Sequence, residues 1–471
     1  MNGNNSTAET TVSEKLPDGK LLAMQWKTID WKEAEQEVNR LQVRIVKATQ
    51  EKKWNTVKRL QYLLTHSFYA KALAVRRVTT NKGKKTAGVD GIIWSTPAMK
   101  MRAVISLTDK GYKAKPLRRV YIEKKGKKKK RPLGIPTMYD RAMQALYALA
   151  LEPVAETTAD TKSFGFRKGR CCQDACEYIF TTLSRKVSPE WVLEGDIKGC
   201  FDNIDHRVLA NVINAKIKDA RLIQLIWKFL KAGYMEDWQY HATYSGCPQG
   251  GIVSPILANI YLNELDKFVE KTAKEFYKSR DRHHTPEYDK ITWQIKKAQK
   301  QLKTATGQEK TALLQKIAQL KAVMHKTPCM SKTDKVIKYI RYADDFILGV
   351  KGDKADCERI KRQLSDFISQ TLKMELSEQK TLITHSNQYA RFLGYDIRVR
   401  RDQKLKPHGN HVSRTLNGSV ELCIPFADKI MPFLFGKSVI RQLRDGTIEP
   451  IARKYIFRCT DLEIVSTYNS E

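Results

Sequence analysis

The segment "YIRYADDFILGV", residues 339–350, places the adjacent carboxylates Asp344 and Asp345 inside an apolar run. The run predicts two strands of a tight hairpin with the acids at its tip. A buried carboxylate without a partner is costly, and two carboxylates side by side repel each other. A divalent cation would neutralise both, and hard oxygen ligands suit Mg²⁺, which also binds a substrate phosphate.

A third acid for such a site is Asp196, at the end of "WVLEGDI". It follows an apolar β run and precedes a turn, so two strand ends can present Asp196 and Asp344 to a shared pair of ions. Two such ions activate an attacking 3′ oxygen and stabilise a leaving pyrophosphate. An Asp at a strand end is also a common helix cap or turn residue. That alternative stays open for Asp196 and is favoured for Asp202 and Asp205.

The charge of the chain indicates a polyanionic partner. Its 471 residues include 85 Lys and Arg against 51 Asp and Glu, a net charge of +34, and such an excess is typical of nucleic-acid-binding proteins. A protein that is merely basic is the alternative. No apolar run reaches the roughly 18 residues of a membrane span. The nine cysteines include no CxxC pair, which argues against a zinc site and suits a reducing compartment.

Distinct regions follow from the sequence pattern. We expect residues 1–25 to form a disordered leader, because they lack a hydrophobic signal core, and residues 26–80 to form basic helices. Residues 81–405 mix strand-like and helical segments, including a β-hairpin around a lysine-rich turn centred on Gly126. Within them, residues 271–335 have heptad spacing, which predicts an antiparallel helical hairpin that we interpret as an insertion.

Seven sequence blocks, in order, resemble the reverse transcriptases encoded by bacterial group II introns. They are "AGVDG", "RRVYIEKKGKKKKRPLGIPTMYDRAMQALYALALEPVAE", "SFGFRKGR", "GDIKGCFDNI", "GCPQGGIVSPILANIYL", "YADD" and "RFLGY". "HSFYAKALAVRRVT" resembles the N-terminal segment of the same proteins. A single "YADD" is a weak signal, but the ordered set is specific. The resemblance implies an α+β right-hand polymerase, with fingers and palm over residues 81–405 and an RNA-binding helical extension over residues 26–80.

Residues 406–471 resemble the start of the maturase region that follows the polymerase in this family. The family continues there through more helices, and often through a DNA-binding segment and an endonuclease. The resemblance therefore implies a partial helical thumb/maturase region and a chain that is truncated at its C-terminal end.

The resemblance also assigns roles to single residues. It makes Asp196 and Asp344 the two main ligands of a metal pair and Asp345 the third carboxylate, all three catalytic. Phe201, five residues after Asp196, matches the aromatic ring that excludes a ribose 2′-OH, with core packing as the alternative. The other nucleotide-binding residues it implies are Lys124, Arg131, Gln249 and Lys380, and its primer-grip residues are Phe392, Leu393 and Gly394.

Physical chemistry supports several of these roles. Lys124 and Arg131 flank the fingertip turn, where an ammonium and a bidentate guanidinium suit a triphosphate. Gln249 belongs to "PQGG", whose glycines allow the backbone to approach a nucleotide closely. Lys380 matches the lysine that helps to protonate pyrophosphate, although an exposed lysine often has no specific role.

The function implied by the resemblance is RNA-directed DNA polymerisation for a group II intron, which copies intron RNA into DNA during retrohoming, together with maturase binding of that RNA for splicing. The expected partners are group II intron RNA, an RNA template with a DNA primer, and dNTPs, with no membrane. The expected cofactor is a pair of Mg²⁺ ions, with Mn²⁺ as a substitute, and the expected location is the bacterial cytoplasm.

Three other functions compete with this interpretation. One is a maturase that binds RNA without polymerising, which the three clustered acids argue against. Another is a reverse transcriptase of the retron, diversity-generating or defence type, which the segment near "IRQLRDG" argues against. The third is an RNA-dependent RNA polymerase, which Phe201 argues against. The sequence sets no oligomeric state.

Overall fold

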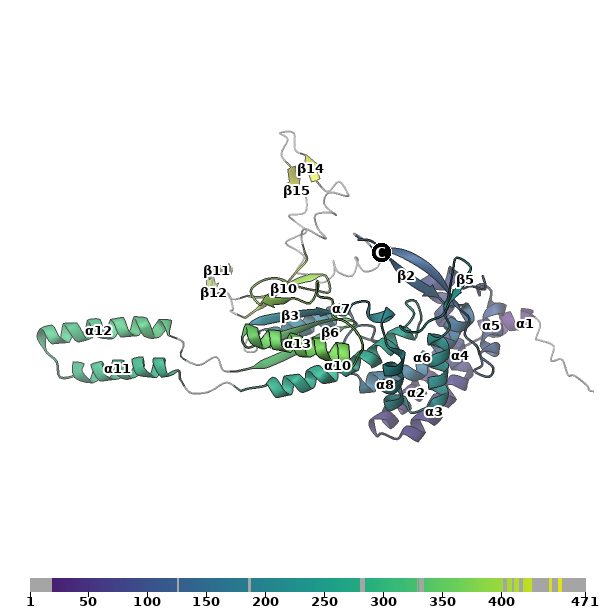
Figure 1. Ribbon diagram of the computed structural model, residues 1–471, viewed down its shortest axis with the longest axis horizontal. Helices are drawn as coiled ribbons and strands as arrows, with labels where there is room; N and C mark the ends of the chain where they lie inside the picture. The colour runs from purple at the N-terminus through teal and green to yellow at the C-terminus, as the bar shows by residue number, and fades with distance from the viewer. Residues whose placement is uncertain are drawn as a thin grey trace, which may run out of the picture. The chain divides into compact units, whose positions relative to one another are not determined.

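The structure is a computed structural model, and it describes residues 19–124, 127–184, 188–279, 284–327, 329, 334–400, 405–408, 411–414, 418–425, 440–442 and 448–450. The chain divides into two compact units, whose helices and strands are labelled in Figure 1. Unit 1 comprises Met1–Arg170, Ile197–Phe268 and Ser365–Glu375, and unit 2 comprises Cys171–Asp196, Val269–Leu364 and Leu376–Glu471.

A helical layer forms much of unit 1. Its helices are α1 (Gly19–Lys27), α2 (Trp31–Gln50), α3 (Trp54–His66), α4 (Phe68–Thr80), α5 (Pro97–Ser106), α6 (Met138–Thr158), α8 (His206–Ile217) and α9 (Ala220–Leu230), with 3₁₀ turns η1 (Lys82–Lys85) and η3 (Cys200–Asp202). Fourteen of the 21 residues of α6 are buried, and α2, α3 and α4 pack against it. A helix that is apolar on nearly every face belongs in a core, so α6 is the central helix of unit 1.

A four-stranded sheet completes unit 1. Its order is β2-β1-β4-β5, with bounds β1 (Leu117–Lys124), β2 (Lys127–Ile135), β4 (Tyr234–Glu236) and β5 (Gln239–His241). The antiparallel pair β1–β2 is the hairpin that the sequence predicts on either side of a lysine-rich turn, and Lys124 is the register partner of Lys127. Residues 125 and 126, at the centre of that turn, lie outside the described residues.

A second four-stranded sheet, in unit 2, contains Asp196 and Asp345. Its order is β6-β7-β3-β8, with bounds β3 (Trp191–Asp196), β6 (Val336–Tyr342), β7 (Asp345–Lys351) and β8 (Ile383–His385). The central strands β3 and β7 are buried along most of their length, as continuous apolar runs predict. Helix α7 (Cys172–Leu183) packs against β6.

The structure also contains a three-stranded sheet and two long helices. Strands β9 (Ala390–Phe392), β10 (Tyr395–Val399) and β13 (Val420–Cys423) form a three-stranded sheet in the order β13-β10-β9. Helices α10 (Ser254–Phe276) and α13 (Lys354–Gln370) each contribute residues to both units.

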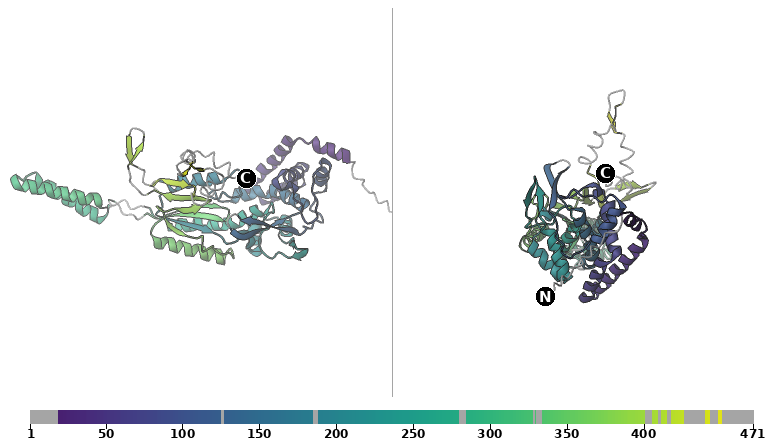
Figure 2. Two further views of the ribbon diagram at one scale, coloured as in Figure 1. Left: turned by 90° about the horizontal axis from the view of Figure 1, so that it is seen from above. Right: turned by 90° about the vertical axis from the view of Figure 1, so that its right-hand side faces the viewer.

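The predicted helical-hairpin insertion is confirmed. Helices α11 (Pro286–Leu302) and α12 (Gly307–Lys326) lie side by side, as Figure 1 shows, and one overlaps the other in the left view of Figure 2. Ile295, Ala298 and Ile317 are the buried residues of the pair, at positions that the heptad spacing predicts. Helix α10 continues to Phe276, so the hairpin begins later than residue 271.

Two predictions about the ends of the chain differ from the structure. The leader expected over residues 1–25 is helical from Gly19 onward, because Leu22 and Trp26 are buried one turn apart and α1 packs on α5. The helices expected after residue 405 are absent from the described part of that region. It instead contains strands β11 (Leu405–His408), β12 (His411–Arg414), β13, β14 (Ile440–Gln442) and β15 (Ile448–Pro450).

The physical reason for β13 is strand pairing. Its Val420 and Leu422 are the register partners of Val399 and Ile397 on β10, so apolar residues meet across the ladder. The helical expectation depended on the family resemblance, which does not detect such pairing. The remainder of residues 426–471 lies outside the described residues. Among the described helices, none has the length and apolar character needed to cross a membrane.

Candidate active site

Asp196 and Asp345 face each other across two antiparallel strands of unit 2. Asp196 ends β3, Asp345 begins β7, and the two are direct register partners. Side chains of direct partners lie on the same face of a sheet. The structure therefore brings together two of the three acids that the sequence singles out, and the partner of Asp196 is Asp345.

Asp344 lies in the two-residue turn that joins β6 to β7. Tyr342 and Asp345 are the last partners of that hairpin, which leaves Ala343 and Asp344 as its loop. Ala343 has φ +56°, as two-residue hairpin loops of the primed classes require at their first position. The buried Arg341 donates from Nη1 to the Ala343 carbonyl at 2.8 Å, which fixes the loop. The predicted hairpin with acids at its tip is confirmed.

A glycine before Asp196 permits close packing beneath the acids. Gly195 is the register partner of Phe346, and a Cβ placed on Gly195 would lie 2.1 Å from the Phe346 ring. Only glycine allows the ring to lie across β3 at this point. The ring of Phe346 therefore packs directly over β3, next to Asp196 and Asp345.

The acids interact strongly with each other. Burial, the hydrogen bond to Asp196 and the charge of Asp344 together raise the pKa of the Asp345 carboxyl to about 7. Like charges held this close in a partly buried site favour a shared proton or a bound cation.

Lys380 supplies a positive charge to the same site. Its Nζ donates to Asp196 Oδ2 at 2.7 Å. Burial lowers the pKa of Lys380, but the hydrogen bond to Asp196 and the charges of the other two acids outweigh it and leave that pKa raised. The turn that carries Lys380 is fastened to β3, because the Ser377 main-chain N–H donates to the Asp196 carbonyl at 2.8 Å.

The donor set fits a hard divalent cation that keeps part of its water shell. In the described ranges, no group of three or more His, Cys, Asp or Glu side chains is arranged to hold a metal ion. Asp196 and Asp345 are nevertheless paired carboxylates, and the pKa of the Asp345 carboxyl is raised. Mg²⁺ is typically bound through one or two carboxylates with substrate phosphates and water completing its shell, so the residues present fit that ion.

A pocket of unit 1 contains two of the predicted nucleotide-binding residues. Phe201, in η3, and Gln249 both line a pocket of about 340 Å³. The loop of Gln249 is tied to the β-hairpin, because the Gly134 N–H donates to the Gln249 carbonyl at 2.8 Å. Gly250, at φ +111°, approaches the Gly134 carbonyl so closely that a Cβ would lie 2.6 Å from it. This glycine therefore permits a close approach to the main chain of β2, and the predicted approach to a nucleotide stays a prediction.

Arg119 is a wall of the same pocket that the sequence did not single out. Its guanidinium lies 3.7 Å from the centroid of the Tyr234 ring, and its Nε is buried without a hydrogen-bond partner among the described residues. A cation stacked on an aromatic face with a donor left over is suited to receive an anion. The sequence feature that could have identified Arg119 is the alternation of side chains along β1, which places residue 119 on one face of the strand.

Lys124 and Arg131, the two residues predicted to bind the triphosphate, lie elsewhere on the β1–β2 hairpin. Pro132 and Gly134 line the pocket, so their neighbour Arg131 points to the opposite face of β2. Arg131 is exposed there, as the register partner of Ile122. For Lys124 the structure describes the backbone, at the tip of β1, and not the side chain.

The predicted primer-grip residues form a tight turn in unit 2. Phe392 and Tyr395 are register partners of β9 and β10, and Leu393 and Gly394 are the two residues between them. Both have positive φ, +52° and +80°, as a two-residue hairpin of type I′ requires. Phe392 is buried and anchors the turn.

Comparison with known proteins identifies the family. Residues 26–107 match the N-terminal domain of reverse transcriptase, and residues 122–304 match reverse transcriptase (RNA-dependent DNA polymerase). Group II intron-encoded protein LtrA of Lactococcus lactis subsp. cremoris is 50% identical over 432 residues, 91% of this chain and 71% of that protein. This chain belongs to the group II intron-encoded reverse transcriptases. The family resemblance expected from the sequence is thereby confirmed, and the chain is an RNA-directed DNA polymerase.

Other similarities are weaker. Protein YkfC of Escherichia coli (strain K12) is 32% identical over 358 residues, 74% of this chain and 84% of that protein. Among solved structures, apo telomerase from Candida tropicalis, truncated from its C-terminal domain, has a TM-score of 0.38 and 14% identity, covering 60% of this chain and 53% of that chain. Reverse transcriptases as a family use divalent metal ions, in agreement with the paired acids of unit 2.

Asp202 and Asp205, which follow Asp196 in the sequence, have different structural roles. Asp205 caps α8, because its side chain accepts hydrogen bonds from the Arg207 and Val208 main-chain N–H groups, as the helix-cap alternative predicts. Asp202 instead accepts from Gln249 Nε2 at 3.0 and 3.1 Å. It belongs to the pocket of unit 1 in this polymerase, which the sequence pattern did not reveal.

Proposed function

We propose that this reverse transcriptase copies group II intron RNA into DNA from a DNA primer, with Asp196, Asp344 and Asp345 as its catalytic acids. The observation that carries the proposal is the direct pairing of Asp196 with Asp345 beside a turn that holds Asp344. A protein that only binds RNA has no use for carboxylates that repel each other. This placement therefore favours polymerisation over a maturase that does not polymerise.

The acids of unit 2 would hold two Mg²⁺ ions, with Mn²⁺ as a substitute. Such ions, when bound, stabilise the negative charge that develops on the reacting phosphate and on the leaving group. The primer 3′ oxygen forms a bond to the dNTP α-phosphorus while the bond to pyrophosphate breaks, and the 3′-hydroxyl proton departs. The Lys380 ammonium, whose pKa is raised, remains protonated and can donate a proton to the leaving pyrophosphate.

The pocket of unit 1 would receive the incoming nucleotide. Arg119 offers an unsatisfied Nε–H to an anionic oxygen. Gln249 is held by Asp202, which fixes the orientation of its amide. Phe201 lines the same pocket with an aromatic ring and would exclude a ribose 2′-OH. Lys124 and Arg131, on the fingertip hairpin, and the turn of Phe392, Leu393 and Gly394 would contact the triphosphate and the primer respectively.

The RNA partner follows from charge and family. A net charge of +34 suits the phosphates of a folded RNA, and LtrA is named as a group II intron-encoded protein. We infer that the basic helices over residues 26–80 bind intron RNA, which would support splicing as well as reverse transcription during retrohoming. The proposal includes the bacterial cytoplasm as the place where that RNA is met.

The experiment is primer extension with purified protein, an RNA template, a DNA primer, dNTPs and Mg²⁺, alongside Asp196→Asn. A matched control is Asp366→Asn, which changes an exposed acid of α13. The proposal predicts template-length DNA from the wild type and from the control, and loss of product from Asp196→Asn. RNA binding without any DNA product from the wild type would instead support the non-polymerising maturase.

A further inference from the structure

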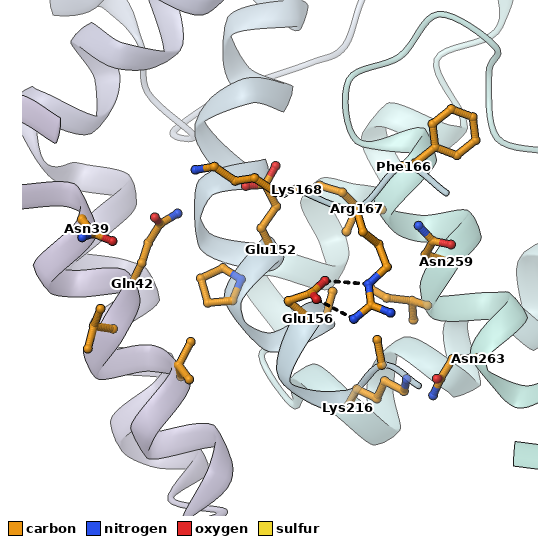
Figure 3. Close-up of a pocket in the computed structure, with 17 residues that line it drawn as sticks. Asn39, Gln42, Glu152, Glu156, Phe166, Arg167, Lys168, Lys216, Asn259 and Asn263 are labelled. Carbon is orange, nitrogen blue, oxygen red and sulfur yellow. Dashed lines mark hydrogen bonds and ion pairs between the residues drawn. The ribbon is translucent and has the colours of Figure 1, made fainter. Parts of the chain in front are cut away.

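The loop that carries Phe166 is anchored through the residues that precede and follow Phe166. Arg167 is buried, and its Nε and Nη2 donate to Glu156 at 2.8 and 2.5 Å. Asn259 Nδ2 donates to the Gly165 carbonyl at 2.8 Å. Figure 3 shows Arg167 turned toward Glu156 and the Phe166 ring away from this ion pair, at the edge of a pocket of about 310 Å³. The main chain on both sides of Phe166 is therefore fixed.

Phe166 itself has an unfavourable conformation and little burial. Its φ is +58°, in the left-handed region where a bulky side chain crowds the main chain. Its side chain is 56% exposed, so burial does little to offset that cost. A strained residue that its surroundings hold in place is a reason to look for a function.

The ring of Phe166 contacts the ring of Phe201. Their centroids are 5.8 Å apart and their planes cross at 82°, the edge-to-face geometry that aromatic pairs favour. The main chain of Phe201 is fixed separately, because its carbonyl accepts from the Cys247 N–H at 2.7 Å. With that main chain held, rotation of the side chain is the freedom left to Phe201. Phe166 is placed to restrict it.

We propose that Phe166 is a positioning residue for Phe201 and thereby sets the discrimination between dNTPs and rNTPs. A ring excludes a 2′-OH only while it stays in one rotamer, and an edge-to-face neighbour disfavours the others. The inference rests on the proposed role of Phe201 in the nucleotide pocket. The strained loop conformation presents the Phe166 ring to Phe201, and the Arg167–Glu156 ion pair keeps it there.

The alternative use of an exposed ring is direct stacking on a nucleobase. Stacking would strengthen binding of dNTPs and rNTPs alike, because both carry the same base face. A positioning role changes the ratio of the two specificity constants instead. The two roles therefore differ in a measurable quantity.

The experiment measures kcat/KM for dATP and ATP, which carry the same base, with wild type, Phe166→Ala, Phe201→Val and the double variant. Loss of an edge-to-face contact predicts that Phe166→Ala lowers the dNTP/rNTP ratio by about three- to tenfold. In the Phe201→Val background, Phe166→Ala should change the ratio by less than about twofold, since contacting residues are coupled. Phe166→Tyr, which keeps the ring, should retain the wild-type ratio.

Two further variants separate the ring from folding. Phe166→Gly removes the ring and relieves the left-handed strain, so it should lower the ratio as Phe166→Ala does while matching or exceeding its Tm. Phe180→Ala removes an exposed ring of α7 and should leave the ratio unchanged. An unchanged ratio in both ring-free variants overturns the inference, and so does an equal loss of kcat/KM for both nucleotides.

The inference and the proposed function can fail separately. Suppose that the wild type extends a primer and that Phe201→Val lowers the dNTP/rNTP ratio. If Phe166→Ala then lowers that ratio by the same factor with and without Phe201→Val, the positioning role alone is overturned. If Phe201→Val leaves the ratio unchanged, the assigned role of Phe201 falls and the inference falls with it. A wild type that makes no DNA overturns the proposed function.

Discussion

Asp196 and Asp345 are direct partners across β3 and β7, and the Lys380 ammonium lies 2.7 Å from Asp196. The three residues are far apart in the sequence and meet because one sheet orders its strands β6-β7-β3-β8. The sheet thus gathers two mutually repelling acids and a cation at one strand end. The negative charges of two acids this close together must be neutralised by a proton, a lysine or a metal ion.

Gly195→Ala should destabilise the protein and impair the site together. The added Cβ would lie 2.1 Å from the Phe346 ring, so the strands must separate or the ring must move. Overpacking of this kind costs about 1–3 kcal/mol. Chemical denaturation should show that loss, and primer extension should fall at temperatures where the variant remains folded.

A second substitution should compensate for the clash at Gly195, and another glycine provides the control. Phe346→Leu in the Gly195→Ala background removes the clashing ring edge and should restore part of the stability. Gly83→Ala, whose Cβ would meet its nearest atom at 3.6 Å, should change stability by less than about 0.5 kcal/mol. Equal effects of Gly195→Ala and Gly83→Ala would show that close packing under Asp196 is unimportant.

The sequence predicts this part of the fold well for local reasons. Apolar runs that end at Asp196 and begin at Asp345 define buried strands, and the two residues between Tyr342 and Asp345 can only form a tight turn. The Leu393–Gly394 turn is recognisable in the same way. Such features depend on neighbours along the chain, so one sequence suffices to find them.

The pocket of unit 1, which we propose to bind the nucleotide, was harder to predict, because its residues depend on strand register. A shift of one residue moves every side chain of a strand to the other face. Arg119 and Arg131 are both basic residues of one hairpin, yet Arg119 lines the pocket and Arg131 does not. The left-handed conformation of Phe166 was also invisible, since a loop with flanking glycines gives no signal that the phenylalanine adopts it.

Arg119→Met should weaken use of the incoming nucleotide. Arg119 lines the pocket with an unsatisfied Nε–H, and a hydrogen bond to a charged group contributes about 1.5–3 kcal/mol. We expect kcat/KM for dNTPs to fall about tenfold or more, with partial recovery in Arg119→Lys, which keeps the charge but loses the planar fork. Steady-state kinetics on one template measures this.

The neighbouring Arg118 provides the control for that experiment. It is exposed and lies on the other face of β1, so Arg118→Met should leave dNTP kinetics within about twofold. Similar losses from both substitutions would mean that general positive charge, and not the pocket, determines nucleotide use.

Lys380→Met should lower kcat more than it raises KM for dNTPs. The ammonium bonds to Asp196, which we propose as a catalytic acid, and loss of a general acid typically costs about 10²-fold or more in rate. Single-turnover rates at saturating Mg²⁺ and dNTP test this, with Lys354→Met, at an exposed lysine of α13, as the control. A pure rise in KM would assign Lys380 to nucleotide binding only.

Single-turnover primer extension by Asp345→Asn and Asp344→Asn, measured with the affinity of each variant for RNA, tests the central claim most directly. Loss of a ligand to ions that stabilise several kcal/mol of developing charge predicts a fall in rate of about 10³-fold or more. RNA affinity should stay within about threefold, because basic side chains and not carboxylates attract RNA phosphates. Extension near the wild-type rate by both variants, with unchanged Mg²⁺ dependence, would contradict the account.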